Sequence, residues 1–252
     1  MSIKPLVFVD LDDTLFQTHR KILPQPNHQI ATLDKFGQPL SYMQPKQQNF
    51  VQWLLECTEL VPVTARSVEA LQRVKIDFQY GAICAHGGVI LQPNGQVNDA
   101  YMQQQQQALI HLQSYMQTLP EQLKDWAQPF GSIRTWVVQE NNLAIYVVAK
   151  QNQPEALFLD DLVEALPDEI STHFYIHQNG NNLALIPHLT SKRRAVEYWL
   201  KHLTADVSER PILGWGDSLS DLGFLSCCDW FGLPKHSQIH QQLVGELLCQ
   251  HS

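Results

Sequence analysis

The sequence lacks any apolar run long enough to cross a membrane. A transmembrane helix needs about 20 consecutive apolar residues. The run nearest the N-terminus, Leu6–Val9, spans four residues and is followed closely by three acids, Asp10, Asp12 and Asp13. The apolar part of a secretory leader is longer than this and is not followed by acids. We therefore expect a cytoplasmic protein with no membrane contact.

Cysteine is scarce and shows no metal-binding pattern. The count of five is odd, and no pair of short spacings typical of a zinc site occurs. Cys227 and Cys228 are adjacent, which makes a disulfide between them unfavourable on geometric grounds. The sequence therefore predicts free thiols, as is usual in the cytoplasm.

Positive charge is also in short supply. The chain has 17 Lys and Arg against 25 Asp and Glu, a formal net charge of −8. A negative field opposes binding to nucleic acids and anionic membranes, and no basic stripe offsets it. A small phosphorylated molecule would meet the same repulsion, so its site would need a local cation. The oligomeric state is left open.

The chain of 252 residues, 44% of them hydrophobic, suits one large domain or a core with a second unit. The first third alternates strands and helices, which favours a Rossmann-like parallel sheet in an α/β fold. We expect strands at 6–9, 60–63 and 80–85 and helices at 46–57 and 67–74. Residues 30–43 suggest a hairpin, with Pro39 confining its second arm to a sheet edge.

The middle of the chain follows a different pattern. A Gln-rich segment over 101–118 indicates a helix with a solvated face. Further elements are expected at 134–138, 143–149, 154–166, 174–176 and 183–186, the first two strands joined at Asn141-Asn142. The core pattern then resumes with a helix at 191–202, a strand at 212–213 and a helix at 243–249. We therefore predict a core at 1–91 and 185–252 with an inserted α+β cap domain at 92–184.

The strongest chemical signal is VFVDLDDT, residues 7–14. Asp10, Asp12 and Asp13 crowd together directly after a predicted buried strand. Carboxylates this close repel one another unless they share a proton or a cation. The alternative is an ordinary polar loop in which Asp12 or Asp13 caps a helix.

Three further segments each have a common structural explanation when taken alone. GWGDSLSD (214–221) with Asp217 and Asp221 could be a simple turn, Thr64 could cap a helix, and Lys192 could be a solvated surface charge. Asp10 and Thr64, however, both follow predicted strands, and ligands bind at the carboxyl ends of parallel strands. The order of acid pair, hydroxyl, lysine and second acid pair favours a functional site.

Together these segments resemble the four motifs of the haloacid dehalogenase-like hydrolase superfamily. The matching strings are DLDDT (10–14), VTAR (63–66), SK (191–192) and GDSLSD (216–221). The insertion resembles the large α/β cap of the sugar-phosphatase-like branch, which includes the Cof-type, sucrose-phosphatase and mannosyl-3-phosphoglycerate phosphatase groups. AHGGVI (85–90) and LALIPHLTSK (183–192) resemble the boundaries of that cap.

The resemblance implies roles for particular residues. Asp10 is the expected nucleophile, which forms an aspartyl-phosphate, and Asp12 the expected acid/base. The expected cofactor is Mg²⁺, and its expected residues are Asp10, Asp12 through its backbone carbonyl, Asp217 and Asp221. Asp221 could instead fix Lys192. The expected substrate-binding residues are Thr64 and Lys192, with Arg66, His86 and Gly87 as further candidates; His86 could equally be an ordinary loop histidine.

The expected activity is hydrolysis of a small phosphate ester, such as a sugar phosphate or a related ester. Arg134, His177, Asn179 and Asn181 are candidate cap contacts to the leaving group, although ordinary turn chemistry is the favoured explanation for them. Two positions depart from many relatives, Asp13 where Gly is common and Ser220 where Asn is common. The alternatives are a phosphotransferase or phosphomutase on the same fold and a non-catalytic phosphate-binding protein.

Overall fold

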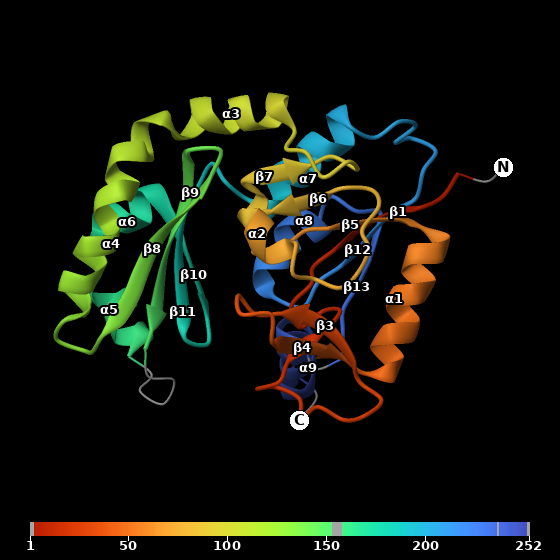
Figure 1. Cartoon of the computed structure of the whole chain (residues 1–252), viewed down its shortest axis with the longest axis horizontal. Helices are drawn as coiled ribbons and strands as arrows, with labels where there is room; N and C mark the ends of the chain where they lie inside the picture. The colour runs from red at the N-terminus through yellow and green to blue at the C-terminus, as the bar shows by residue number, and fades with distance from the viewer. Residues whose placement is uncertain (1–2, 153–157, 236, 251–252) are drawn as a thin grey trace. The chain divides into compact units, whose positions relative to one another are not determined.

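The computed structural model describes residues 3–152, 158–235 and 237–250 (Figure 1). The chain divides into two compact units, a core unit of Met1–Asn98 with Lys192–Ser252 and an inserted unit of Asp99–Ser191. The inserted unit begins seven residues later than the cap expected from position 92. Residues 92–98 fold back onto the core strand β7 (Val89–Leu91), where the backbone N of Asn98 donates to Ile90 O (2.8 Å).

The core unit contains the predicted parallel sheet, in the order β13-β12-β1-β5. These strands are β1 (Leu6–Val9), β5 (Glu59–Pro62), β12 (Ile212–Trp215) and β13 (Trp230–Gly232). The helices of this unit are α1 (Pro45–Cys57), α2 (Val68–Leu71), α7 (Lys192–His202), α8 (Leu222–Leu225) and α9 (Gln238–Gln250), with short 3₁₀ turns η1 (Ala85–Gly87) and η3 (Leu219–Asp221). The α/β prediction is confirmed.

Both faces of β1 are buried, which explains its uninterrupted apolar sequence. Val7 and Val9 pack in one cluster with Leu54 of α1. Phe8 points to the other face, where its ring meets Trp199 of α7 edge-on at 6.3 Å. Since Val9 pairs with both Trp215 and Pro62, the carboxyl ends of β1, β12 and β5 meet at one edge of the sheet.

Two small sheets in the core unit differ from expectation. The hairpin of β3 (Gln29–Leu33) and β4 (Pro39–Met43) forms, but β4 is the middle strand because β2 (Gln17–Thr18) pairs with its other side. Proline is tolerated there because Pro39 is the first residue of β4 and lies beyond the part that pairs with β2. The strand expected at 80–85 is the shorter β6 (Ala82–Cys84), which pairs antiparallel with β7.

The inserted unit is built on an antiparallel sheet in the order β10-β11-β9-β8, as the α+β prediction requires. Its strands are β8 (Ile133–Glu140), β9 (Leu143–Gln151), β10 (Phe174–Asn179) and β11 (Asn182–Pro187). Its helices are α3 (Asp99–Leu109), α4 (Gln113–Ala127), α5 (Leu159–Ala165) and α6 (Asp168–His173), with the 3₁₀ turn η2 (Ile110–Leu112) between α3 and α4. The first part of the helix expected at 154–166 lies outside the described residues.

One expectation about this unit needs correction. The Gln run on α3 is largely solvated, but Gln105 is only 2% exposed and its Oε1 accepts a hydrogen bond from Thr190 Oγ1 (3.3 Å). A helix face that looks uniformly polar in sequence therefore contributes one glutamine to the interior of the unit. Met116, Leu119 and Leu123 of α4 form the main core of the unit with one face of the sheet.

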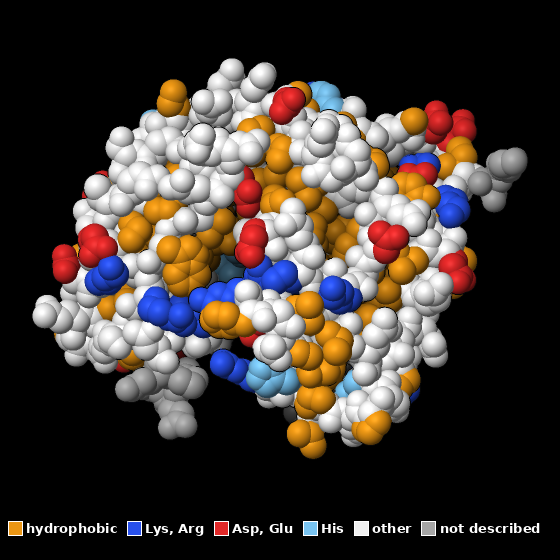
Figure 2. Space-filling model, viewed as in Figure 1, with side chains coloured by type: hydrophobic (Ala, Val, Ile, Leu, Met, Phe, Trp, Pro, Cys, Tyr) orange, Lys and Arg blue, Asp and Glu red, His pale blue; other side chains and the backbone are white. Residues whose placement is uncertain are grey.

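The surface fits the composition. Uncharged side chains and backbone, drawn white, cover much of the face in Figure 2, as expected for a chain with 17% charged residues. Within the described part of the chain, no helix combines the length and apolarity needed to cross a membrane. Cys57, Cys84, Cys227 and Cys228 are free thiols.

Candidate active site

Three carboxylates from distant parts of the sequence meet at the carboxyl edge of the parallel sheet. Asp10 follows β1, and Asp217 and Asp221 lie in the loop and turn after β12. The two strands run in register, and the backbone N of Asp10 donates to Trp215 O at 2.8 Å. As a result, carboxylate oxygens of the three aspartates lie within 4.8 Å of one another.

Lys192, the first residue of α7, neutralises part of this charge. Its Nζ donates to Asp10 Oδ1 at 2.6 Å and to Asp221 Oδ1 at 2.7 Å, and its side chain is 9% exposed. Burial acts to lower the pKa of Lys192, but the two carboxylates outweigh it, so the pKa is raised. Lys192 is therefore a permanent cation between two acids.

Asp221 is held by more contacts than any other acid of the cluster. Its Oδ2 accepts from Ser218 Oγ (2.8 Å), Ser218 N (3.0 Å) and Asp217 N (3.2 Å). Burial acts to raise the pKa of Asp221, but Lys192 and the Ser218 bonds outweigh it and the pKa is lowered. Gly216 allows this packing, because a Cβ there would lie 2.6 Å from Asp221 Cβ. With both oxygens engaged, Asp221 orients Lys192 and the loop.

Asp10 and Asp217 have fewer hydrogen bonds and cations to stabilise their negative charge. The pKa of Asp10 is raised well above its usual value, first by burial and then by Asp221 and Asp217, against the pull of Lys192. Burial, Asp221 and Asp13 raise the pKa of Asp217 to about 6. Thr14 Oγ1 lies 3.1 Å from Asp217 Oδ1 and 3.4 Å from Asp10 Oδ2, and its single hydrogen can serve only one at a time.

The balance of charge in this cluster shows whether a divalent cation would fit there. Three carboxylates lie close together with one ammonium group, and the pKa values of Asp10 and Asp217 are raised, first by burial and then by the neighbouring carboxylates. Carboxylate oxygens are the ligands that Mg²⁺ prefers. The residues present therefore suit a magnesium ion beside Asp10 and Asp217.

The other two N-terminal acids each have a cation of their own. Arg66 Nε and Nη2 donate to the two carboxylate oxygens of Asp12, both at 2.7 Å, while its guanidinium lies 5.4 Å from the Phe16 ring centre. Lys21 Nζ pairs with Asp13 at 2.5 Å. Arg66 therefore contacts Asp12 in this structure, and its direct role in substrate binding stays a prediction. Neither acid caps a helix, since the chain makes only a turn before β2.

Thr64 follows the end of β5 and is 1% exposed. Its Oγ1 accepts from the backbone N of Arg66 (3.1 Å), whereas the cap of α2 is Ser67, whose Oγ accepts from Ala70 N (3.2 Å). The helix-cap explanation for Thr64 is thus wrong. The Thr64 carbonyl accepts from His86 N at 3.1 Å, so the segments that carry these residues are joined.

The segment at His86 has an unusual backbone. Ala85, His86 and Gly87 have φ values of 52°, 56° and 95°, all in the left-handed region. Only glycine adopts this region without strain, and such strain concentrates at functional sites. His86 is 8% exposed. The backbone N of Ala85 donates to Arg66 O at 2.7 Å, which fixes the strained segment to the residue that holds Asp12.

Contacts thus join Asp10, Lys192, Asp217 and Asp221 in one cluster. Asp12 is paired separately with Arg66 through its side chain, and Thr64 with His86 through the backbone. Sequence reasoning gave no role to Thr14 or Lys21, although Thr14 stands in the first motif. In the inserted unit, Arg134 lies on β8, His177 on β10 and Asn181 in the turn that follows β10. The side chain of Asn179 lies outside the described part of the structure, and the four suggested cap contacts stay predictions.

No protein-family model and no curated protein matches the sequence. Solved structures do match. The sucrose-phosphatase of Synechocystis sp., in complex with sucrose and phosphate, is 16% identical with a TM-score of 0.52, covering 98% of each chain. The C-terminal domain of C. albicans trehalose-6-phosphate phosphatase is 14% identical with a TM-score of 0.59, covering 88% of this chain and 73% of that one.

A haloacid dehalogenase-like hydrolase from Bacteroides thetaiotaomicron is 10% identical with a TM-score of 0.53, covering 97% of this chain and 100% of the other. At these identities the similarity concerns the fold. The chain has the fold of haloacid dehalogenase-like sugar phosphatases over nearly its whole length, which confirms the resemblance drawn from the four motifs at the level of fold.

Proposed function

We propose that this protein is a Mg²⁺-dependent phosphatase that hydrolyses a small phosphorylated metabolite, a sugar phosphate or a related ester, through an aspartyl-phosphate. The observation that carries the proposal is the buried cluster of Asp10, Lys192, Asp217 and Asp221 at the carboxyl edge of the core sheet. The fold similarity to phosphatases of sucrose phosphate and trehalose 6-phosphate supports the substrate class.

The residues that would hold the metal are Asp10 and Asp217 through their carboxylates and Asp12 through its backbone carbonyl. Bound there, Mg²⁺ supplies positive charge that lets an anionic nucleophile approach an anionic phosphate. Asp221 contributes indirectly, since it accepts hydrogen bonds from Lys192 and from the loop that carries Asp217.

In the first step, a carboxylate oxygen of Asp10 attacks phosphorus and the bond from phosphorus to the ester oxygen breaks. Asp12 gives its proton to the leaving oxygen. Lys192 and Thr64 bind the phosphoryl oxygens, where negative charge collects in the transition state. Lys192 contacts Asp10 Oδ1 at 2.6 Å, so a phosphoryl group on Asp10 would lie within its reach.

In the second step, Asp12 accepts a proton from water and the water oxygen attacks phosphorus. The bond from phosphorus to Asp10 breaks, which releases inorganic phosphate and restores the carboxylate. Arg66 holds both oxygens of Asp12 and so fixes the group that moves the proton in each step. Ala85 and His86 support the segment of Thr64 and Arg66 through backbone hydrogen bonds.

Phosphate release from a panel of sugar phosphates and from p-nitrophenyl phosphate, with Mg²⁺ and with EDTA, tests the proposal. We expect release only with Mg²⁺, no release by Asp10→Asn, and normal release by the control Asp125→Asn, whose carboxyl is exposed on α4. Acid-quenched enzyme should carry covalent phosphate that Asp10→Asn lacks. Unchanged turnover in Asp10→Asn would refute the proposal, and transfer of phosphate to an organic acceptor instead of water would indicate a mutase.

A further inference from the structure

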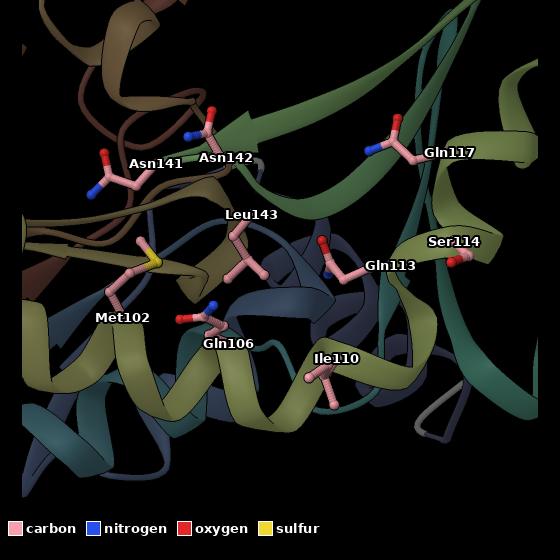
Figure 3. Close-up of a pocket in the computed structure, with 9 residues that line it drawn as sticks. All are labelled: Met102, Gln106, Ile110, Gln113, Ser114, Gln117, Asn141, Asn142 and Leu143. Atoms are coloured by element: carbon pink, nitrogen blue, oxygen red, sulfur yellow. The ribbon is translucent and has the colours of Figure 1, made fainter.

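A cavity of about 610 Å³ in the inserted unit has a lining without charge (Figure 3). Five of its nine lining residues carry side-chain amides, namely Gln106, Gln113, Gln117, Asn141 and Asn142, and none carries a charged group. All nine lining residues belong to this unit, whereas the aspartate cluster belongs to the core unit. Its size falls in the range of small-molecule sites.

The Gln-rich sequence builds this lining by helical spacing. Met102 and Gln106 are four residues apart on one face of α3, and Ile110, four residues further on, begins the turn η2 (Figure 3). The turn η2 then interrupts the helix, and Gln113 and Gln117 repeat the spacing on α4. Of the five consecutive glutamines from 103 to 107, only Gln106 lines the cavity.

The frame of the cavity is fixed by backbone contacts. Gln113 Oε1 accepts from Ala144 N (2.9 Å), and its Nε2 donates to Ala144 O (3.1 Å) and Leu109 O (3.3 Å). These bonds hold the start of β9 against the junction of the two helices. Leu143 and Met102, 6% and 8% exposed, supply an apolar floor.

Several amide side chains at the rim of the cavity are not used in hydrogen bonds within the described part of the protein. Within the described residues, the side-chain amides of Gln106, Gln117, Asn141 and Asn142 make no hydrogen bond to another group of the protein. Asn141 and Asn142 form a two-residue turn with φ values of 49° and 63°, a geometry that fixes the position of the hairpin end.

An amide both donates and accepts hydrogen bonds, as a hydroxyl does, and neither carries charge. An ionic ligand would find no counter-charge in this lining. A sugar offers hydroxyls for the amides and C–H groups for the apolar floor. We therefore propose that this cavity binds an uncharged polyhydroxylated ligand, either a free sugar or the sugar portion of a larger molecule.

The test is a titration of the full-length protein with sucrose, trehalose, glucose and glycerol, followed by NMR of the side-chain amides. We expect saturable shifts at the cavity amides with at least one sugar and none with inorganic phosphate. The double variant Gln106→Ala/Gln117→Ala should raise Kd about tenfold, the loss of two neutral hydrogen bonds. The matched control is Gln104→Ala/Gln107→Ala, which removes two exposed amides of α3 outside the cavity.

Three outcomes would overturn the proposal: no saturable shift with any sugar, an equal loss of binding in both double variants, or shifts of the same size with phosphate. All four glutamines are exposed, so the variants should fold. A thermal unfolding curve for each checks this.

Kinetics separate the two sources of the sugar. If the cavity holds the sugar portion of a substrate, Gln106→Ala/Gln117→Ala raises KM for that sugar phosphate and not for p-nitrophenyl phosphate, and the free sugar competes. If it holds a separate sugar, saturation with the phosphate ester leaves sugar binding unchanged. The NMR measurement needs no turnover, so a protein that binds sugar but releases no phosphate would refute the proposed phosphatase and leave the sugar site standing.

Discussion

Replacing Arg66 with lysine should impair acid/base chemistry far more than it impairs folding. The Arg66 guanidinium grips both oxygens of Asp12 at 2.7 Å and lies against the Phe16 ring. Lysine keeps the charge but cannot make two parallel bonds to one carboxylate. Asp12 would then lose the fork that sets its orientation.

The expected loss of stability follows from the exposure of the two side chains, and the expected loss of rate from what acid/base catalysis contributes. The side chains of Arg66 and Asp12 are 13% and 39% exposed, so solvent screens the pair. We expect Arg66→Lys to lower the free energy of unfolding by only about 1 kcal/mol, the upper end for an ion pair of this kind. General acid/base catalysis is worth roughly 100- to 10,000-fold in rate, and a misoriented acid should lose about 10- to 100-fold of it.

The assay is kcat for a sugar phosphate in a double-mutant cycle with Asp12→Asn. If Arg66 acts through Asp12, adding Arg66→Lys to Asp12→Asn costs nothing further, because the group it positions is already lost. The defect should also be smaller with p-nitrophenyl phosphate, whose leaving group departs without help from an acid. Arg193→Lys is the control, since Arg193 pairs with Glu197 at the surface and its side chain is 58% exposed.

If the losses of kcat from the two substitutions multiplied in the double variant, this reasoning would be refuted. Arg66 would then be assigned the direct substrate contact expected from the sequence. A wild-type kcat in Arg66→Lys would show that the fork has no part in positioning Asp12. A loss of stability of several kcal/mol would show that the pair is structural.

Three further outcomes follow from the charge cluster. Asp221→Asn should lower the free energy of unfolding by about 3 kcal/mol in urea denaturation, because buried Lys192 loses one of its two carboxylates, whereas the exposed Asp125→Asn should change it by under about 0.5 kcal/mol. The raised pKa of Asp217, about 6 against a usual 3.8, means that the metal-free native state holds an extra proton between these values. Its contribution to stability is present below the lower value and lost as pH rises through the higher one. Asp217→Asn should reduce this fall in thermal stability and leave the part that comes from Asp10, whose pKa is also raised. Stabilisation by Mg²⁺ in the wild type should vanish as pH drops below about 6, where protons compete for the same carboxylate.

The elements that sequence predicted well are those with a local signal. Leu6–Val9 is apolar on both faces, so a buried strand followed by Asp10 was readable without any knowledge of its neighbours. Strand β13 was missed because its three residues are largely exposed, with Trp230 at 64% and Phe231 at 53%, and show no buried pattern. Helix α6 was missed because its six residues have one buried apolar side chain, Ile170.

The contacts that define the site are non-local, and these the sequence could not supply. Asp12 and Arg66 are 54 positions apart, and Lys192 and Asp10 are 182 apart. The motifs suggested which residues belong together, but the choice of cation for each acid depends on distances of a few ångströms. Lys21, in a segment of turns, gave no signal at all for its pairing with Asp13.

The distribution of these cations explains where the site lacks positive charge. Arg66 pairs with Asp12, Lys21 pairs with Asp13, and Lys192 is shared between Asp10 and Asp221. Asp217 has only the Thr14 hydroxyl as a side-chain partner among the described contacts, and Asp217 and Asp10 are the two aspartates of the cluster whose pKa values rise. A net charge of −8 implied that any phosphate site must supply its own cation. Burial and the neighbouring carboxylates raise both of these pKa values, and a magnesium ion held by Asp10 and Asp217, as proposed above, would supply that cation.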